Sequence, residues 1–210
     1  THWRAAAIVL LAAGAASAGA LASPQQAPRM LSVSGNVSPV HDPVLAKHND
    51  AYYLFVTGGR NGRGVLPIRR SPDLLHWEQT GFVFPDALPA WTTTEVPRAN
   101  NAWAPDISFF RGRYHLYYSV SSFGSRDSAI GLATNSTLDP SSPDYQWVDE
   151  GMVLRSFVDR DDWNAIDPNI VIEDAQNIWI NWGSFWGGIK MRRIDPATGK
   201  LSTTDTTMYD

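Results

Sequence analysis

The sequence predicts an all-β protein of the β-propeller class, and three observations lead to that prediction. Short alternating runs rich in Val, Ile, Tyr, Phe and Trp are separated by clusters of Gly, Pro, Asn and Asp, whereas helical periodicity is nearly absent beyond the N-terminal stretch. A proline-led segment recurs at Pro43, Pro105 and Pro168, with spacings of 62 and 63 residues. Each period has room for four short strands, which is the content of one propeller blade.

The first element along the chain is a predicted secretory signal peptide over residues 1–22. A basic Arg precedes an apolar, Ala-rich run, and either Ala16-Ser17-Ala18 or Ala20-Leu21-Ala22 supplies small residues for cleavage. The apolar run is too short to cross a bilayer, so no membrane association is expected. A linker is predicted over residues 23–34, and a partial propeller domain over residues 35–210.

Three blade starts follow in order, each with a proline, a short strand, a polar turn and an aromatic strand. The segments are DPVLAKHNDAYYLFVTG from Asp42, APDISFFRGRYHLYYSV from Ala104 and DPNIVIEDAQNIWINWG from Asp167. Proline suits the first position of a strand because no interior ladder bond is lost there. Further strand pairs are expected between these segments, separated by turn signals such as Asp-Pro-Ala-Thr-Gly from Asp195.

Three blades do not close a ring, since propellers have about four to eight. An open arc leaves a sheet edge and apolar faces uncovered. The sequence therefore predicts that the chain is a truncated form of a longer propeller, or that other material completes the ring.

Composition restricts the classes of function. The chain has no cysteine, so its stability depends on the core and not on disulfides. Its formal net charge of -4 argues against nucleic acid as a partner, which would require a basic face. The chain has 9 Trp, 7 Tyr and 8 Phe, and aromatic faces pack against the C–H faces of sugar rings as well as in sheet cores. An acidic, aromatic-rich, secreted protein without a cofactor motif fits the carbohydrate-active class.

Two carboxylates occupy the position directly before the repeat proline, which we call the slot. The slot holds Asp42, Ala104 and Asp167 in the three blades, whereas Asp106 lies one residue after its proline. An isolated Asp-Pro pair is a common turn feature. Because the innermost strand of each blade lines the central channel, repetition in register predicts that Asp42 and Asp167 share one cavity. Glycoside hydrolysis requires carboxylates on either side of the scissile bond.

Several motifs in order resemble glycoside hydrolase family 43. They are HDP at 41–43, WAPD at 103–106, the run YYSVSSFGSRDSAIGLATNSTLD, NAIDPN at 164–169 and GSFWGGI at 183–189. The resemblance covers about residues 35–203, and NAIDP with GSFW is most similar to the endo-1,5-α-L-arabinanases. It implies a five-bladed β-propeller that hydrolyses arabinan, a side chain of pectin, by an inverting mechanism.

The resemblance also implies roles for the matching residues. Asp42 is expected to be the general base that activates water. Asp167 is expected to orient the general acid and to raise its pKa, because a nearby negative charge disfavours the ionised acid. Contacts with the substrate are expected from His41, Trp103, Phe123, Gly124, Asn164, Ser184, Phe185 and Trp186. The aromatic members of this set are candidate platforms for stacking, and Asn164 is expected to bond the sugar or to position Asp167.

The general acid of the family is a Glu that starts the fourth blade. One more repeat after Asp167 falls at about residue 230, past Asp210, so this Glu is expected to be missing from the chain. None of the Glu residues present matches the motif, and Glu150 is interpreted as a turn residue. The sequence requires no metal or cofactor, although the resemblance leaves room for a channel calcium in the full-length fold, held through a His of the last blade.

Two alternatives to an endo-arabinanase remain open. One is an exo-acting arabinofuranosidase or xylosidase of the same family, and the other is an inactive fragment that binds carbohydrate. Loss of acid catalysis lowers a rate by about 10²–10⁴-fold, so little activity is expected from the chain itself. The expected partner is arabinan, the expected location is extracellular, and the full-length form is expected to be a monomer.

Overall fold

The structure is a computed structural model, and it describes residues 29–58 and 64–210. Residues 32–210 form one compact unit. The predicted signal peptide over residues 1–22 lies outside the described residues, as does the linker up to residue 28. Within the described ranges, no helix has the length and apolar character needed to cross a membrane.

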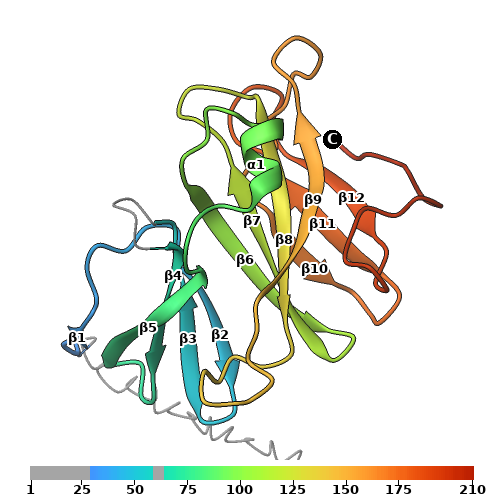
Figure 1. Cartoon of the computed structure of the whole chain (residues 1–210). Coiled ribbons are helices and arrows are strands. Elements are labelled where there is room, and N and C mark those ends of the chain that lie inside the picture. Colours follow the sequence, from blue (N-terminus) through green and yellow to red (C-terminus); the bar gives the residue numbers. More distant parts are fainter. Residues whose placement is uncertain (1–28, 59–63) are drawn as a thin grey trace, which may run out of the picture. The chain divides into compact units, whose positions relative to one another are not determined.

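The regular secondary structure of the described residues is almost entirely β-strand, with one short helix, as Figure 1 shows. The strands are β1 (Ser34–Gly35), β2 (Val44–His48), β3 (Ala51–Phe55), β4 (Val65–Ser71), β5 (His76–Phe84), β6 (Ala102–Phe110), β7 (Arg113–Val120), β8 (Ser128–Asn135), β9 (Val148–Ser156), β10 (Asn169–Ile172), β11 (Ile178–Trp182) and β12 (Lys190–Ile194), and the helix is α1 (Ala90–Glu95).

Three sheets follow one another along the chain, in the colours blue to green, green to orange and orange to red (Figure 1). Their strand orders are β1-β5-β4-β3-β2, β6-β7-β8-β9 and β10-β11-β12, with every pair antiparallel except β1 with β5. Sheets of consecutive antiparallel strands are the blades of a propeller. The edge strands β2, β6 and β10 begin close to the three slots, which supports the prediction of a blade start at each of them.

The third sheet and helix α1 depart from the prediction. In the described chain the third sheet has three strands and not four, and the residues after β12 pair only through the isolated bridges Ile194–Leu201 and Met191–Tyr209. Helix α1 was not predicted because a run of Thr residues has low helix propensity. Its first turn follows Pro89, and the Thr92 hydroxyl donates to the Pro89 carbonyl oxygen at 2.8 Å.

Two hydrophobic cores lie on opposite faces of the second sheet. Leu116 and Tyr118 of β7 pack into the core shared with the first sheet, and Tyr117 packs into the core shared with the third. Successive residues of a strand point to opposite faces, so a sheet covered on both sides has a continuous apolar sequence. All residues of β8 are buried for this reason. The second sheet therefore fixes β6 beside both β2 and β10, and this arrangement positions the slots.

Candidate active site

The three slot residues share an unusual backbone conformation. Asp42, Ala104 and Asp167 have φ angles of 47°, 39° and 56°, in the left-handed region that residues other than Gly rarely adopt. The proline that follows each of them disfavours the right-handed helical region for the residue before it. We infer that the three repeats are equivalent in structure and that the slot side chains leave their blades in the same way.

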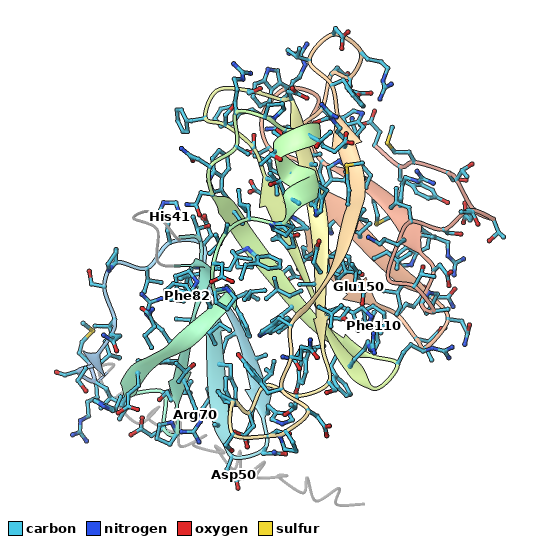
Figure 2. The ribbon with its side chains drawn as sticks, in the orientation of Figure 1. His41, Asp50, Arg70, Phe82, Phe110 and Glu150 are labelled. Atoms are coloured by element: carbon cyan, nitrogen blue, oxygen red, sulfur yellow. The ribbon has the colours of Figure 1, made fainter. Side chains whose placement is uncertain are left out.

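Asp42 and Asp167 line one cavity of about 1020 Å³. The same cavity is lined by every other residue predicted for the site, from all three blades: His41, Trp103, Phe123, Gly124, Asn164, Ser184, Phe185 and Trp186. Figure 2 places His41 at one end of the first sheet, opposite the β2–β3 turn that carries Asp50. The cavity size is at the upper end of the range for ligand pockets, about 300–1,000 Å³. The structure thus brings the predicted set together, while the role of each residue stays a prediction.

The contacts of Asp42 with the protein are made through one carboxylate oxygen. His41 Nδ1 lies 2.8 Å from Asp42 Oδ2, and the Thr57 hydroxyl donates to the same oxygen at 2.6 Å. The hydrogen bond to Asp42 and the negative charge of its carboxylate raise the pKa of His41. Among the described residues, no hydrogen bond is made to Asp42 Oδ1, so this oxygen is free to accept a proton from a water molecule in the cavity.

Asp167 is held through its backbone and not through its carboxylate. Its N–H donates to the Ser119 hydroxyl oxygen at 2.8 Å. Asp167 is exposed to the cavity, but the surrounding protein removes part of the water around its carboxylate. This desolvation is the larger cause of a raised pKa of Asp167, and the negative charge of Asp42 is the smaller cause. The effect of Asp42 on Asp167 means that the two carboxylates influence each other across the cavity.

Exposed aromatic side chains line the rim of the cavity. Phe123 is fully exposed, and Phe185 and Trp186 are 86% and 47% exposed. Phe185 and Trp186 also have φ angles of 56° and 39°, an uncommon backbone conformation in two successive bulky residues. Strained backbone concentrates at ligand sites, and uncovered aromatic faces suit stacking on sugars. This geometry supports the prediction that these side chains contact the substrate.

Asn164 presents an unsatisfied polar atom in the wall of the cavity. Its side chain is 2% exposed, and its Oδ1 is buried without a hydrogen-bond partner among the described residues. Buried polar atoms are rarely left unpaired, because an unpaired group costs about 1–3 kcal/mol. The free acceptor makes Asn164 a suitable contact for a ligand hydroxyl.

Sequence reasoning missed Thr57, Ser119 and Arg69. Thr57 and Ser119 bond the slot residues, and a signal for them existed, because each lies 15 residues after the slot of its own blade (42 to 57 and 104 to 119). Arg69 lines the cavity and is 4% exposed, and its guanidinium donates to the carbonyl oxygens of Asn36 and Pro39. Arg69 thereby holds the segment from Asn36 to Pro39 that leads to His41. No pattern in the sequence indicates this tertiary contact.

Glu150 is a strand residue, so its interpretation as a turn residue was wrong. It lies in β9 between Asp149 and Gly151, where the register with β8 shifts, and it is the extra residue of a β-bulge. Its carboxylate accepts a hydrogen bond from the Thr134 hydroxyl at 2.7 Å. Figure 2 shows Glu150 well away from His41. Among the described residues that line the cavity, none is a Glu.

The prediction of a channel calcium in the full-length fold remains untested. In the part of the chain that the structure describes, no three side chains of His, Asp or Glu are grouped so as to hold a metal ion.

Two of the curated relatives that the chain matches have similar identity to it but differ in their named mode of action. The chain is 43% identical over 157 residues to an extracellular exo-α-(1→5)-L-arabinofuranosidase of Cellvibrio japonicus, which covers 74% of this chain and 44% of that protein. It is 40% identical over 161 residues to an extracellular endo-α-(1→5)-L-arabinanase of Bacillus subtilis, with coverages of 77% and 48%. The chain thus spans about half the length of these curated relatives.

Solved structures show the same relationship. A Cellvibrio cellulosa α-L-arabinanase in complex with arabinohexaose is 39% identical, with a TM-score of 0.74 and coverages of 81% of this chain and 52% of that chain. The native arabinanase of Bacillus subtilis is 38% identical, with a TM-score of 0.72 and coverages of 81% and 56%. These arabinanases are five-bladed β-propellers, which confirms the predicted fold class. The family model for glycosyl hydrolases family 43 matches residues 37–210, and the chain belongs to this family.

Proposed function

We propose that the protein containing this chain is a secreted endo-1,5-α-L-arabinanase that cleaves arabinan with inversion. The observation that carries the proposal is that Asp42 and Asp167 line one cavity whose rim bears exposed aromatic side chains. Two carboxylates at a bond to be cleaved are the requirement of glycoside hydrolysis. Relatives described as extracellular support secretion.

In the proposed reaction, Asp42 is the general base. Its Oδ1 accepts a proton from water as that water attacks the anomeric carbon of an arabinofuranosyl unit. Oδ2 keeps its contacts with His41 and Thr57 during this step, so the carboxylate stays oriented. In inverting enzymes the water lies between base and acid, which are about 6.5–9.5 Å apart.

The leaving oxygen requires a proton, and we propose a Glu in the slot of a fourth blade as its donor. The repeat predicts that slot at about residue 230 of a longer chain. Asp167 would lie beside this Glu and raise its pKa through negative charge, which keeps the acid protonated before cleavage. The elevated pKa of Asp167 itself, caused by burial and by Asp42, is in line with a crowded acidic centre.

A comparison of two substrates tests this division of labour on the 210-residue chain. The first is linear arabinan, whose sugar leaving group requires protonation. The second is a dinitrophenyl glycoside of an α-1,5-arabino-oligosaccharide, whose leaving group departs without an acid. Release of dinitrophenol together with arabinan cleavage that is slower by about 10²-fold or more is the expected result. If the chain turned over neither the dinitrophenyl glycoside nor arabinan, the result would contradict the proposed function.

The exo-acting alternative is favoured by one specific observation, the 43% identity to a relative named as an exo-acting arabinofuranosidase. The size of the products from linear arabinan distinguishes the two modes. Endo action releases a mixture of oligosaccharides from the first moments of the reaction, whereas exo action releases a single small product. Chromatography of early time points makes this comparison, and a single product would replace the endo proposal.

A third reading is a binding protein that keeps the aromatic cleft without catalysis. It predicts retardation of the chain in gels that contain linear arabinan, with no turnover of the dinitrophenyl glycoside. Dinitrophenol release by the parent chain that is lost in the Asp42→Asn variant would rule out the hypothesis of a binding protein.

A further inference from the structure

The Thr57 hydroxyl makes two hydrogen bonds that join the base carboxylate to the next blade. It donates to Asp42 Oδ2 at 2.6 Å and accepts from the N–H of Ala104 at 2.7 Å. Because a backbone N–H only donates, the Thr57 oxygen must accept from Ala104. Its single proton is then directed toward Asp42, so the direction of both bonds is fixed.

We propose that Thr57 is a positioning residue that sets the orientation of the Asp42 carboxylate by anchoring it to the backbone of the second blade. The proposal deepens the proposed function, since it concerns how the base of that site is held. Thr57 lines the same cavity as Asp42 and lies on the segment that follows β3.

The same contact recurs one blade later, which shows that it belongs to the architecture of the repeat. Ser119 lies at the position of its blade that Thr57 occupies in the first, and its hydroxyl oxygen accepts the N–H of Asp167 at 2.8 Å. In both cases a hydroxyl holds the slot residue of the following blade. The slot in the blade of Ser119 is Ala104, which has no carboxylate to accept a proton from Ser119. The slot in the blade of Thr57 is Asp42, and the Thr57 hydroxyl donates its proton to that carboxylate.

The contact decides which oxygen of Asp42 is available to the substrate. Thr57 and His41 both bond to Oδ2, and neither bonds to Oδ1. A water molecule that meets the base in the cavity must therefore meet Oδ1. Without the Thr57 hydroxyl, only the exposed His41 would restrain rotation of the carboxylate, and His41 is itself held by no other side-chain hydrogen bond among the described residues.

The test uses Thr57→Val, which keeps the shape of the side chain and removes the hydroxyl, and Thr57→Ser, which restores the hydroxyl. Thr134→Val is the matched control, because the Thr134 hydroxyl also donates to a carboxylate, that of Glu150, outside the cavity. Crystal structures of the four proteins give the first readout, and amide hydrogen exchange of Ala104 gives the second. Neither readout requires catalysis.

In Thr57→Val we expect the Asp42 carboxylate to rotate so that Oδ2 leaves His41 Nδ1, and the Ala104 amide to exchange at least about tenfold faster. Thr57→Ser and Thr134→Val should keep both features of the parent. An unchanged Asp42 carboxylate in Thr57→Val would overturn the proposal. These results stand whether or not the chain cleaves arabinan, so failure of the positioning role is distinguishable from failure of the proposed function.

Turnover of the dinitrophenyl glycoside adds a kinetic readout. Thr57→Val should lower kcat by about 10- to 100-fold and change KM by less than about threefold, because a misdirected base slows the attack without weakening sugar binding. Thr57→Ser should recover most of the lost kcat. A fall in kcat that is the same in Thr57→Val and Thr134→Val would point to general destabilisation and would contradict the positioning role.

Discussion

At the scale of single residues, the two slot carboxylates have different surroundings although they follow the same repeat. Asp42 has one oxygen saturated by His41 and Thr57 and the other open, whereas the carboxylate of Asp167 has no hydrogen bond from the described residues. Equivalent backbone positions therefore support different roles, because the neighbours that the repeat does not fix differ between the blades. A base needs one directed free oxygen, and Asp42 has it.

Substitution of the two carboxylates should separate their roles. On the dinitrophenyl glycoside, Asp42→Asn should lower kcat/KM by at least about 10²-fold, because no other group takes the proton of the water. Asp167→Asn should lower it by less than about tenfold, since this leaving group requires no acid. Initial rates measured by dinitrophenol absorbance make the comparison. A larger loss in Asp167→Asn than in Asp42→Asn would reverse the assignment.

His115 should make the stability of the fold depend on pH. The side chain is 3% exposed and stacks on Phe110 with ring centroids 3.6 Å apart, and burial lowers the pKa of His115 to about 4. In the unfolded chain His115 becomes protonated near pH 6.5, whereas in the folded chain it becomes protonated only near pH 4. The free energy of unfolding should therefore decrease by about 2–3 kcal/mol, through this group alone, as the pH falls from about 6.5 to 4.

Urea unfolding at pH 7.5 and pH 4.5 measures this contribution. The change in unfolding free energy between the two pH values should be smaller in His115→Gln than in the parent chain, because the variant has no group to protonate at this position. The other titrating groups are common to both proteins. An equal change in both would contradict the assignment to His115.

At the scale of the elements, adjacent blades are joined by few polar contacts next to the slots. Asp106 of β6 accepts the N–H of Ile170 in β10 at 2.9 Å, with Asn169 Nδ2 at 3.4 Å from its other oxygen. Burial raises the pKa of Asp106, while the hydrogen bond from Ile170 acts in the opposite direction. Asp106 thus fixes the strand that begins directly after the slot of the third blade.

Removal of this carboxylate should loosen the third blade. Asp106→Ala leaves the N–H of Ile170 without its partner, and we expect a loss of about 1–3 kcal/mol in the free energy of unfolding. The control Asp86→Ala removes an exposed carboxylate that makes no hydrogen bond among the described residues, and it should change stability by less than about 0.5 kcal/mol. Urea unfolding measures the free energy of unfolding of both variants. An equal loss in Asp106→Ala and Asp86→Ala would contradict a stabilising contact between Asp106 and Ile170.

Gly131 of β8 packs so closely against Tyr118 and Trp91 that it leaves no room for a side chain. A Cβ at this position would lie 2.4 Å from Tyr118 Cζ and 2.8 Å from Trp91 Cζ2, and Tyr118 is fully buried. Gly131→Ala should therefore destabilise the fold by about 1–3 kcal/mol. At Gly81 in β5 an added Cβ meets no atom within 4 Å, so Gly81→Ala should be nearly neutral. Thermal unfolding compares the two, and a neutral Gly131→Ala would contradict the described packing.

At the scale of the whole molecule, the features that could be predicted from the sequence are those set by the repeat of about 62 residues. The proline and the aromatic strand recur in every blade, so the positions of Asp42 and Asp167 in one cavity followed from register. Glu150 was predicted wrongly because the Gly that follows it, which has a positive φ, suits a β-bulge as well as a turn. The contacts of Arg69 with the carbonyl oxygens of Asn36 and Pro39 join segments far apart in the sequence, which local patterns do not encode.

The proposed reaction involves more of a propeller than the three blades described here. The chain spans about half of the curated relatives it matches, and its described residues supply two carboxylates and an aromatic rim in one cavity. In this account, substrate binding and the orientation of the base are properties of the blades described here. In the proposed reaction, protonation of the leaving group depends on a Glu of a fourth blade.

The most direct test is a crystal structure of Asp42→Asn soaked with a linear α-1,5-arabino-oligosaccharide. The substitution prevents cleavage and leaves the cavity in place. We expect the sugar chain in the cavity, with a ring stacked on Phe185 or Trp186 and one glycosidic bond between the side chain at position 42 and Asp167. An oligosaccharide bound at another face of the molecule, or no bound sugar at saturating concentration, would contradict it.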